Sequence, residues 1–448
     1  QTTAAPARDR PPGRHGGSAP WTVGRPPYSP CNPNPLGAPR TKIARAKAPP
    51  PVGTAHVKEL DKRMGQQTPT KTPGVVRREV RRLVRQIMTA PAVLTSYLFA
   101  ARYYDLIHGK KVRRIAGAVG PANKVAVYLI FPQQGLLASH LGALDYLRSK
   151  GYAPVVVSNI ALDAGAQAQV LKAAHLYVER PNFGYDFGGY RDGILSIADR
   201  LPKLDHLCLL NDSTWFNLPG AEDWLDAAEA LRVDLAAAAS NYGVPRVKME
   251  EFRRIEWRYL TTHKNFHFCS FALLFSQRVL ADPDFLRFWQ RFPLTSNKSR
   301  TVRRGEIGLS KWILARDYTH GTTCDITHLD RELSALGDDR IREIADNLIS
   351  PDDPQFQVVK HELLAAGPSR EDLISLILTG VARRGSSYVL ADYTLTEKRF
   401  PFLKKSPVWL NQEASDITLK LAAALPGPGG EVIVDEIKAL RAARPPRF

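Results

Sequence analysis

The chain of 448 residues has only four cysteines, Cys31, Cys208, Cys269 and Cys324, and none of them forms a Cys-x-x-Cys pair. The spacing that is typical of a structural zinc site is therefore missing. Cys208 and Cys269 lie inside apolar runs, where a free cysteine behaves as a small core residue. This sparse use of cysteine favours a reducing, cytoplasmic compartment.

Long uncharged apolar runs are also missing near the start of the chain. The longest one, Ile87 to Ala101, has 15 residues and contains Pro91. A helix needs about 20 such residues to cross a bilayer, and a secretory signal needs an apolar core behind basic residues. We therefore expect neither a transmembrane helix nor a secretory signal in this part of the chain.

Positive charge is unevenly distributed along the chain. The formal net charge is +18, but residues 1–120 hold 22 Lys+Arg against 5 Asp+Glu, and the remainder holds 40 against 39. A basic arm can meet nucleic acid or an anionic membrane surface. The near-neutral body argues against a broad nucleic-acid groove, so no nucleic-acid partner is predicted.

Composition divides the chain into four parts. Residues 1–74 are rich in Pro, Gly and basic residues and predict a disordered arm. Residues 75–120 begin with a basic amphipathic pattern, VVRREVRRLVRQIM, which favours either a helix packed on the main domain or one lying on anionic lipid. Residues 121–328 predict the main domain, and residues 329–448 a mainly helical accessory region with a C-terminal tail.

The main domain alternates apolar strands with helices. KVAVYLIF, APVVVS, HLYVER and HLCLL are predicted strands, and the later run FHFCSFALLF is expected at a mixed or antiparallel position. This order predicts an α/β fold with a mostly parallel sheet sandwiched by helices. Right-handed crossovers then place the loops after the strands at one edge, where ligands bind.

The first polar segment expected at that edge is RPNFGYDFGGYRDG, residues 180–193. Its glycines permit tight turns and a close approach of the backbone to a ligand, and the N-terminus of the next helix favours an anion. The segment lacks the Gly-Lys-Ser/Thr ending of a Walker loop and does not match G-x-G-x-x-G. By itself it indicates a simple turn as readily as a phosphate site.

The second polar segment is Asn211-Asp212-Ser213, directly after HLCLL. A carboxylate at the end of a central strand can bind Mg²⁺ or Mn²⁺, which in turn holds a diphosphate. The alternative is a helix cap or an Asx turn.

Taken together, the two segments resemble the rhamnan synthesis protein F family of bacterial polysaccharide synthesis. RPNFGYDFGGYRDG and LLNDS match its two most distinctive motifs, and CSFALLFSQRVLADPDFLRFW, GEIGLSKWI and PFLKKSPVWLNQ are similar to its later part. The resemblance covers roughly residues 122–412. It implies a GT-A-like glycosyltransferase fold, a nucleotide-sugar donor such as dTDP-rhamnose, and a growing glycan, lipid-linked or free, as acceptor.

The resemblance also implies a set of site residues. The donor would be bound by Arg180, Asn182, Gly184, Asp186, Gly189, Arg191, Asn211, Asp212 and Ser213. Asp212 would hold a divalent cation and the diphosphate. The usual metal triplet of this fold is acidic at both ends, whereas Asn211 and Ser213 stand here. Metal binding is therefore expected to be weak or dispensable, with Arg191 or another cation in compensation.

An inverting transfer needs a general base for the acceptor hydroxyl. Glu306 is the candidate, at a predicted helix start, and Asp192 and Asp325 are reserves. The alternative for Glu306 is a residue that only stabilises its helix dipole. His267 and His320 are interpreted as structural or surface residues.

Trp215 and Phe216 follow shortly after the triplet. Either they form an apolar floor for the methyl group of a deoxysugar, or they pack in the core. Two other functions stay open: a non-catalytic sugar-nucleotide-binding scaffold, and a nucleic-acid-binding protein that uses the basic arm.

Overall fold

The computed structural model describes residues 102–446, which all lie in one compact unit of the chain. The predicted arm of residues 1–74, and the helical pattern that begins at residue 75, lie outside the described residues. Residues 102–107 are helical.

A mixed sheet of eight strands forms the centre, in the order β1-β4-β3-β2-β5-β10-β7-β11. The strands are β1 (Arg113–Ala116), β2 (Lys124–Ile130), β3 (Tyr152–Ser158), β4 (Leu176–Glu179), β5 (His206–Asn211), β7 (Leu235–Ala237), β10 (Ala272–Ser276) and β11 (His320–Thr322). Strand β2 pairs in parallel with β3 and β5, and β3 pairs in parallel with β4. Strand β10 runs antiparallel between β5 and β7. The predicted α/β class and the antiparallel place of the later strand are confirmed.

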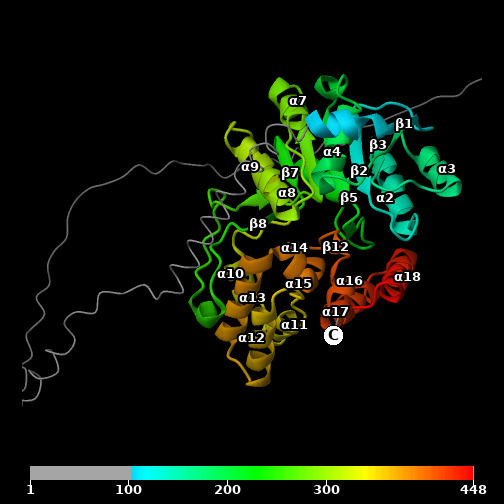
Figure 1. The fold of residues 1–448 in the computed structure, drawn as a ribbon. Helices are drawn as coiled ribbons and strands as arrows, with labels where there is room; N and C mark the ends of the chain where they lie inside the picture. Colours follow the sequence, from blue (N-terminus) through cyan, green and yellow to red (C-terminus); the bar gives the residue numbers. More distant parts are fainter. Residues whose placement is uncertain (1–101, 447–448) are drawn as a thin grey trace, which may run out of the picture. The chain divides into compact units, whose positions relative to one another are not determined.

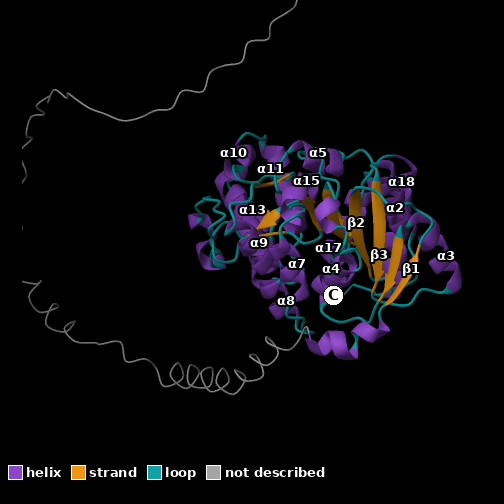
Figure 2. Ribbon diagram, turned by 90° about the horizontal axis from the view of Figure 1, so that it is seen from above, coloured by secondary structure: helices purple, strands orange, loops and turns teal. Residues whose placement is uncertain are grey.

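Helices cover both faces of this sheet (Figure 2). Side chains of β2 alternate between two buried clusters, because successive residues of a strand point to opposite faces. One cluster includes α2 (Ala138–Ser149), α3 (Ala164–Ala173) and α5 (Trp224–Ala230). The other includes α4 (Tyr185–Leu195), α6 (Gln277–Leu280), α7 (Pro283–Gln290) and α9 (Glu306–Leu314).

Glycines bring helix α4 close to the sheet. A Cβ on Gly189 would lie 2.5 Å from Leu129 Cδ1, and one on Gly193 would lie 2.5 Å from Val127 Cγ1. Within the polar segment of residues 180–193, helix α4 begins at Tyr185, so the tight turn expected there is confined to the residues before the helix. Gly184, with φ +85°, and Tyr185, with φ +52°, turn the chain into the helix in the left-handed conformation, which glycine adopts without strain.

The C-terminal region is predominantly helical, as predicted (Figure 1). Its helices are α10 (Leu329–Ser334), α11 (Asp338–Asp346), α12 (Pro354–Ala365), α13 (Arg370–Arg384), α14 (Ser386–Val389), α15 (Ala391–Thr396), α16 (Pro407–Leu410), α17 (Gln412–Ala423) and α18 (Gly427–Ala443). One short strand interrupts them, β12 (Leu403–Lys404), and it pairs antiparallel with β6 (Thr214–Trp215). This pairing brings the C-terminal region to the predicted Asn-Asp-Ser triplet.

Within residues 102–446, none of the helices combines the length and the apolar character that crossing a membrane requires.

We expect Gly193→Ala to lower the free energy of unfolding by about 1–3 kcal/mol, because the new methyl group overpacks the contact with Val127 and Val157. This loss outweighs the better helix propensity of Ala, about 1 kcal/mol. Gly142→Ala in α2 is the matched control, since no atom lies within 4 Å of its added Cβ, and it should raise stability by roughly 0.5 kcal/mol. Urea unfolding measures both variants, and equal stability changes would contradict the packing of α4.

Candidate active site

A cavity of about 280 Å³ opens at the carboxyl ends of β2 and β5. These strands pair in parallel with Leu129 opposite Asn211, so the residues that follow them are neighbours. The lining combines the loop after β2, helices α2 and α4, the predicted triplet and the C-terminal region. It consists of Phe131, Pro132, Gln133, Gln134, Gly135, Leu137, His140, Asp186, Asp212, Ser213, Lys405, Ser406, Trp409, Leu440 and Arg444.

Asp212 is held at the centre of this strand edge. Its Oδ2 accepts a hydrogen bond of 2.6 Å from the Phe131 N–H, and His140 Nε2 lies 3.3 Å from the same oxygen. The Leu137 N–H donates to His140 Nδ1 at 3.1 Å, so a neutral ring carries its proton on Nε2, toward the carboxylate. Burial alone would raise the pKa of Asp212, but His140, Lys405 and the Phe131 N–H together lower it. The carboxyl group is therefore ionised at neutral pH.

Asn211 connects the triplet to helix α4. Its Nδ2 donates to Asp186 Oδ2 at 3.2 Å and to the Tyr190 hydroxyl at 3.1 Å. Its Oδ1 accepts from the Ser213 N–H at 3.1 Å, which is the Asx turn left open as an alternative. The two predicted motifs therefore meet through direct hydrogen bonds.

Asp186 lines the cavity from the first turn of α4. Burial and the negative charges of Glu306 and Asp212 raise its pKa to about 6. The Asp186 carboxyl therefore changes its charge close to neutral pH.

Two lysines flank the triplet: Lys404 is the last residue of β12, and Lys405 directly follows that strand. Lys404 Nζ donates to Ser213 Oγ at 3.3 Å and lies 3.9 Å from the centroid of the Phe271 ring. The Lys405 N–H donates to Ser213 O at 3.0 Å, and the buried side chain reaches Ser139 Oγ at 3.5 Å. Burial lowers the pKa of both lysines, while Glu306 and Asp186 oppose this shift for Lys404, and Asp212 opposes it for Lys405. The strand edge thus carries two partly desolvated lysines next to the triplet, of which Lys405 lines the cavity and Lys404 does not.

Glu306 begins helix α9 beside the cavity without lining it. Ser270 Oγ donates to its Oε1 at 2.7 Å, and His267 Nε2 lies 3.5 Å from its Oε2. His267 Nδ1 lies 2.9 Å from the Asn265 carbonyl oxygen, and the ring is buried. A positioned carboxylate with a histidine behind it is an arrangement that can accept and pass on a proton.

Arg180 and Asp192 lie away from the cavity, in a buried ion pair. Arg180 Nε donates to Asp192 Oδ2 at 2.6 Å, and the exposed fractions of the two side chains are 0% and 5%. The Tyr104 hydroxyl donates to the same oxygen at 2.6 Å. Arg180 also donates to Asn159 Oδ1 and to the Phe183 carbonyl oxygen. The structure thus gives both residues structural partners and does not bring them to the cavity.

Arg191 also points away from the cavity. It donates to both carboxylate oxygens of Asp105 at 2.8 Å and to the carbonyl oxygens of Trp289 and Gln290. Together with Gly189, which packs on Leu129, it fixes the position of α4.

The remaining predicted residues lie in varied places. Asn182 is exposed, whereas Gly184 forms the turn into α4. Asp325 is exposed and accepts hydrogen bonds from its near neighbour Thr327. His320 is half-buried, and its ring lies 5.3 Å from that of Phe268.

Both aromatic residues after the triplet pack in the core. The Trp215 Nε1–H donates to Glu436 at 2.8 Å, and Phe216 stacks on Phe402 with a centroid distance of 4.6 Å. Cys208 and Cys269 are buried and free, as predicted.

A divalent cation finds only a partial donor set at this site. Among residues 102–446, no group of three or more His, Cys, Asp and Glu side chains could hold a metal ion. Asp212 could supply one oxygen ligand while substrate phosphates and water supply the others, as is common for Mg²⁺. The cation at Asp212 stays a prediction.

The fold and the site define an α/β protein with a charged ligand cavity at the carboxyl edge of its strands. The family model described as rhamnan synthesis protein F matches residues 154–363. This match confirms the resemblance to that family which the motifs indicated. The segment PFLKKSPVWLNQ lies beyond the matched residues.

Two curated relatives match parts of the chain. The uncharacterized protein y4gN of Sinorhizobium fredii is 34% identical over 187 residues, which cover 42% of this chain and 45% of that protein. The virulence protein VirA of Vibrio anguillarum is 33% identical over 79 residues, covering 16% of this chain and 25% of that protein. The chain spans less than half the length of these relatives.

The solved structures with some similarity are distant. Core-mannan synthase A from Aspergillus fumigatus, in its Mn/GDP form, has a TM-score of 0.25 and 8% identity, covering 44% of this chain and 71% of that chain. The mannosyltransferase Ktr4p from S. cerevisiae has a TM-score of 0.22 and 9% identity, covering 43% of this chain and 65% of that chain.

Three residues at the site were not predicted from the sequence: His140, Lys404 and Lys405. His140 lies in an ordinary amphipathic helix pattern and carries no motif. The two lysines stand in PFLKKSPVWLNQ, whose resemblance to the family was visible, but only the β6–β12 pairing shows that they reach the triplet. His267 was interpreted as structural, although it faces Glu306.

Asp186→Asn should make the protein more stable at pH 7.5, by up to about 3 kcal/mol. In the folded wild type this carboxyl keeps its proton up to about pH 6, whereas the ordinary value is 3.8. The wild type therefore loses stability as the pH rises between these values, and the Asn variant does not. Urea unfolding at pH 4 and pH 7.5 should show the gain only at the higher pH.

The control for this experiment is Asp145→Asn, which removes a carboxylate whose side chain is 71% exposed. It should change stability by less than about 0.5 kcal/mol at either pH. An equal gain for Asp186→Asn at both pH values would contradict the raised pKa.

Proposed function

We propose that the cavity binds a nucleotide-sugar and that the chain transfers the sugar to a growing cell-surface polysaccharide. The observation that carries the proposal is the pair of Asp212 and Lys405 in the cavity, with Lys404 beside Ser213, in a chain whose residues 154–363 match the rhamnan synthesis protein F family model. The family description favours dTDP-rhamnose as the donor, and a donor of this kind favours a reaction at the cytoplasmic face of the membrane.

The two lysines suit the diphosphate of such a donor. Negative charge grows on the leaving diphosphate as the bond to the sugar breaks, and fixed positive groups at that position lower the barrier. Lys404 and Lys405 are successive residues at a strand end, so their side chains leave on opposite sides of the chain, one toward Glu306 and Asp186 and the other toward Asp212. In this proposal they supply the compensating positive charge, which the sequence analysis expected from Arg191 or another cation.

Asp212 has a supporting role in this arrangement. Its ionised carboxylate favours the charged form of Lys405, against the effect of burial, and lies 3.3 Å from Nε2 of His140. If a divalent cation accompanies the donor, Asp212 is the residue that would hold it, and the cation would add positive charge at the diphosphate.

Other residues around the cavity complete the donor site. Asp186 and Asn211 offer hydrogen-bonding groups for sugar hydroxyls, and the exposed Asn182 and the Gly184 turn lie just before the same helix start. Arg180, Gly189 and Arg191 act as positioning residues, because they fix helix α4 through the buried network.

Glu306 is the proposed general base for an inverting transfer. It would take the proton of the acceptor hydroxyl, while Ser270 and His267 hold its two carboxylate oxygens in place. Asp192 is engaged by Arg180 and Tyr104, which leaves Glu306 as the candidate next to the cavity.

The first test measures donor binding by calorimetry and nucleotide release with a panel of nucleotide sugars. Lys404→Met and Lys405→Met should each weaken binding of the preferred donor by about 10- to 100-fold, since each removes a charged hydrogen bond to the diphosphate. Lys438→Met, which removes an exposed lysine of an i,i+3 pair, is the matched control and should bind like wild type.

Three outcomes of this test matter. No binding of any nucleotide sugar would overturn the proposal, and binding without turnover across an acceptor panel would favour the scaffold. If EDTA abolishes donor binding and the two lysine variants bind the donor like the wild type, a cation and not the lysines holds the diphosphate.

The second test addresses the base. Glu306→Gln should lower kcat by about 10²- to 10⁴-fold while the donor Kd stays within about twofold, because a base acts on the acceptor and not on donor binding. Glu362→Gln, at an exposed position, serves as the control. Wild-type turnover in Glu306→Gln would remove this residue from the mechanism.

A further inference from the structure

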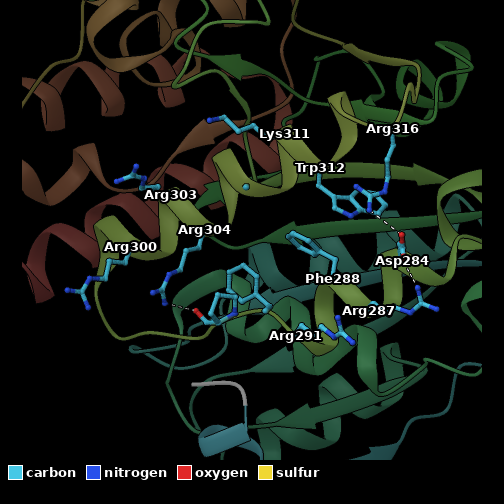
Figure 3. Close-up of a pocket in the computed structure, with 13 residues that line it drawn as sticks. Asp284, Arg287, Phe288, Arg291, Arg300, Arg303, Arg304, Lys311, Trp312 and Arg316 are labelled. Carbon is cyan, nitrogen blue, oxygen red and sulfur yellow. Dashed lines mark hydrogen bonds and ion pairs between the residues drawn. The ribbon is translucent and has the colours of Figure 1, made fainter. Parts of the chain in front are cut away.

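A second, larger hollow lies outside the proposed donor cavity. This basic groove, of about 1090 Å³, is formed by helices α7 (Pro283–Gln290), α8 (Lys298–Arg304) and α9 (Glu306–Leu314) (Figure 3). Its basic residues are Arg287, Arg291, Arg300, Arg303, Arg304, Lys311 and Arg316. The proposed donor chemistry uses none of them.

The basic groove and the proposed site lie on opposite faces of helix α9. Gly308, Lys311 and Trp312 line the groove and follow one helical face. Glu306 and Ser310 lie on the other face, where Ser310 Oγ accepts from the Phe268 N–H at 2.9 Å. The groove is therefore a separate outward surface, which makes it a docking surface rather than an extension of the substrate cavity.

Charge in the basic groove is strongly unbalanced. Asp284 is its only acidic lining residue, and it pairs with Arg287 and Arg316 at one end (Figure 3). Arg304 donates to the Pro293 carbonyl oxygen. Within residues 102–446 no acidic side chain forms an ion pair with Arg291, Arg300, Arg303 or Lys311. Such a surplus of cations complements a partner with many negative charges.

The aromatic residues of the groove decide between two kinds of anionic partner. Phe288 and Trp312 are half-buried and contact each other with a centroid distance of 6.0 Å. Arg316 covers the Trp312 ring at 4.4 Å, and Tyr318 packs on the same ring at 5.7 Å. These rings offer little open face for stacking nucleic-acid bases. An aromatic floor under a rim of Arg and Lys instead suits the interface of a lipid bilayer.

We propose that the basic groove docks this protein on anionic phospholipid headgroups at a membrane surface. Arg300, Arg303 and Lys311 would meet the headgroup phosphates, and Trp312 and Phe288 would lie at the level of the headgroups. The proposal does not depend on the donor chemistry, because helix α9 separates the groove from that cavity.

The test uses the full chain and sedimentation with vesicles of phosphatidylcholine, alone or mixed with phosphatidylglycerol. The variant Arg300→Glu/Arg303→Glu/Lys311→Glu should lower partition into the anionic vesicles by roughly tenfold or more. The control Lys248→Glu/Arg254→Glu/Arg258→Glu makes the same charge change at exposed positions elsewhere. It keeps the groove intact and should therefore bind these vesicles roughly tenfold more tightly than the groove variant. The basic residues before position 102 are present in both variants, so the ratio reports on the groove.

Wild-type binding to anionic vesicles by the groove variant would overturn the proposal, as would equal binding of the wild type to both kinds of vesicle. If the groove variant loses binding to a single-stranded oligonucleotide but keeps its binding to anionic vesicles, the partner of the groove is a nucleic acid. This result would also overturn the membrane proposal. Circular dichroism melting verifies that both triple variants fold. Donor binding should be unchanged in the groove variant, which separates a failure here from a failure of the proposed function.

Discussion

The pairing of β12 with β6 is the contact on which the candidate site depends. Two short strands, far apart in the sequence, place Leu403 opposite Trp215 and Lys404 opposite Thr214. A buried glutamate secures this contact: Glu436 accepts from the Ser139 N–H, the Ser139 hydroxyl and the Trp215 Nε1–H. A buried charge is costly unless several donors satisfy it, so these three bonds join α18, α2 and β6 at a fixed geometry. Without this joint the two lysines would have no defined position relative to Asp212.

The site concentrates charges of both signs in a partly desolvated space. Asp212 keeps a low pKa because a histidine, a lysine and a backbone N–H favour its ionised form. Asp186 has no such set of partners, and burial with two neighbouring carboxylates raises its pKa to about 6. Burial lowers the pKa of both lysines at the same time. An anionic ligand beside a lysine would favour its charged form, so binding would offset part of the cost of burying that lysine.

The periodicity of apolar residues and the order of the segments were sufficient to predict the strands of the sheet and the edge at which the site lies. Alternating strands and helices located β2, β3, β4 and β5, and their carboxyl edge located Asp212. The direction of side chains was harder to predict, because the residues of one motif lie on different faces of one helix. In α4, Asp186 points to the cavity, whereas Arg191 points to Asp105 and Trp289. Glycines expected to approach a ligand instead let the helix approach the sheet.

Helix α9 connects the two surfaces on which the proposals depend. Gly305 separates α8 from α9, and a Cβ there would lie 2.4 Å from the Phe187 ring, so this junction is pressed against α4. Helix α4 is in turn fixed by Arg191 and by the Arg180–Asp192 pair. Glu306 on one face of α9 and the basic groove on the other therefore have a fixed orientation relative to each other, because closely packed helices leave little room for relative movement. A protein docked through the groove would present the edge that carries Glu306 in a fixed orientation to the membrane, and this orientation would suit an acceptor carried by a lipid.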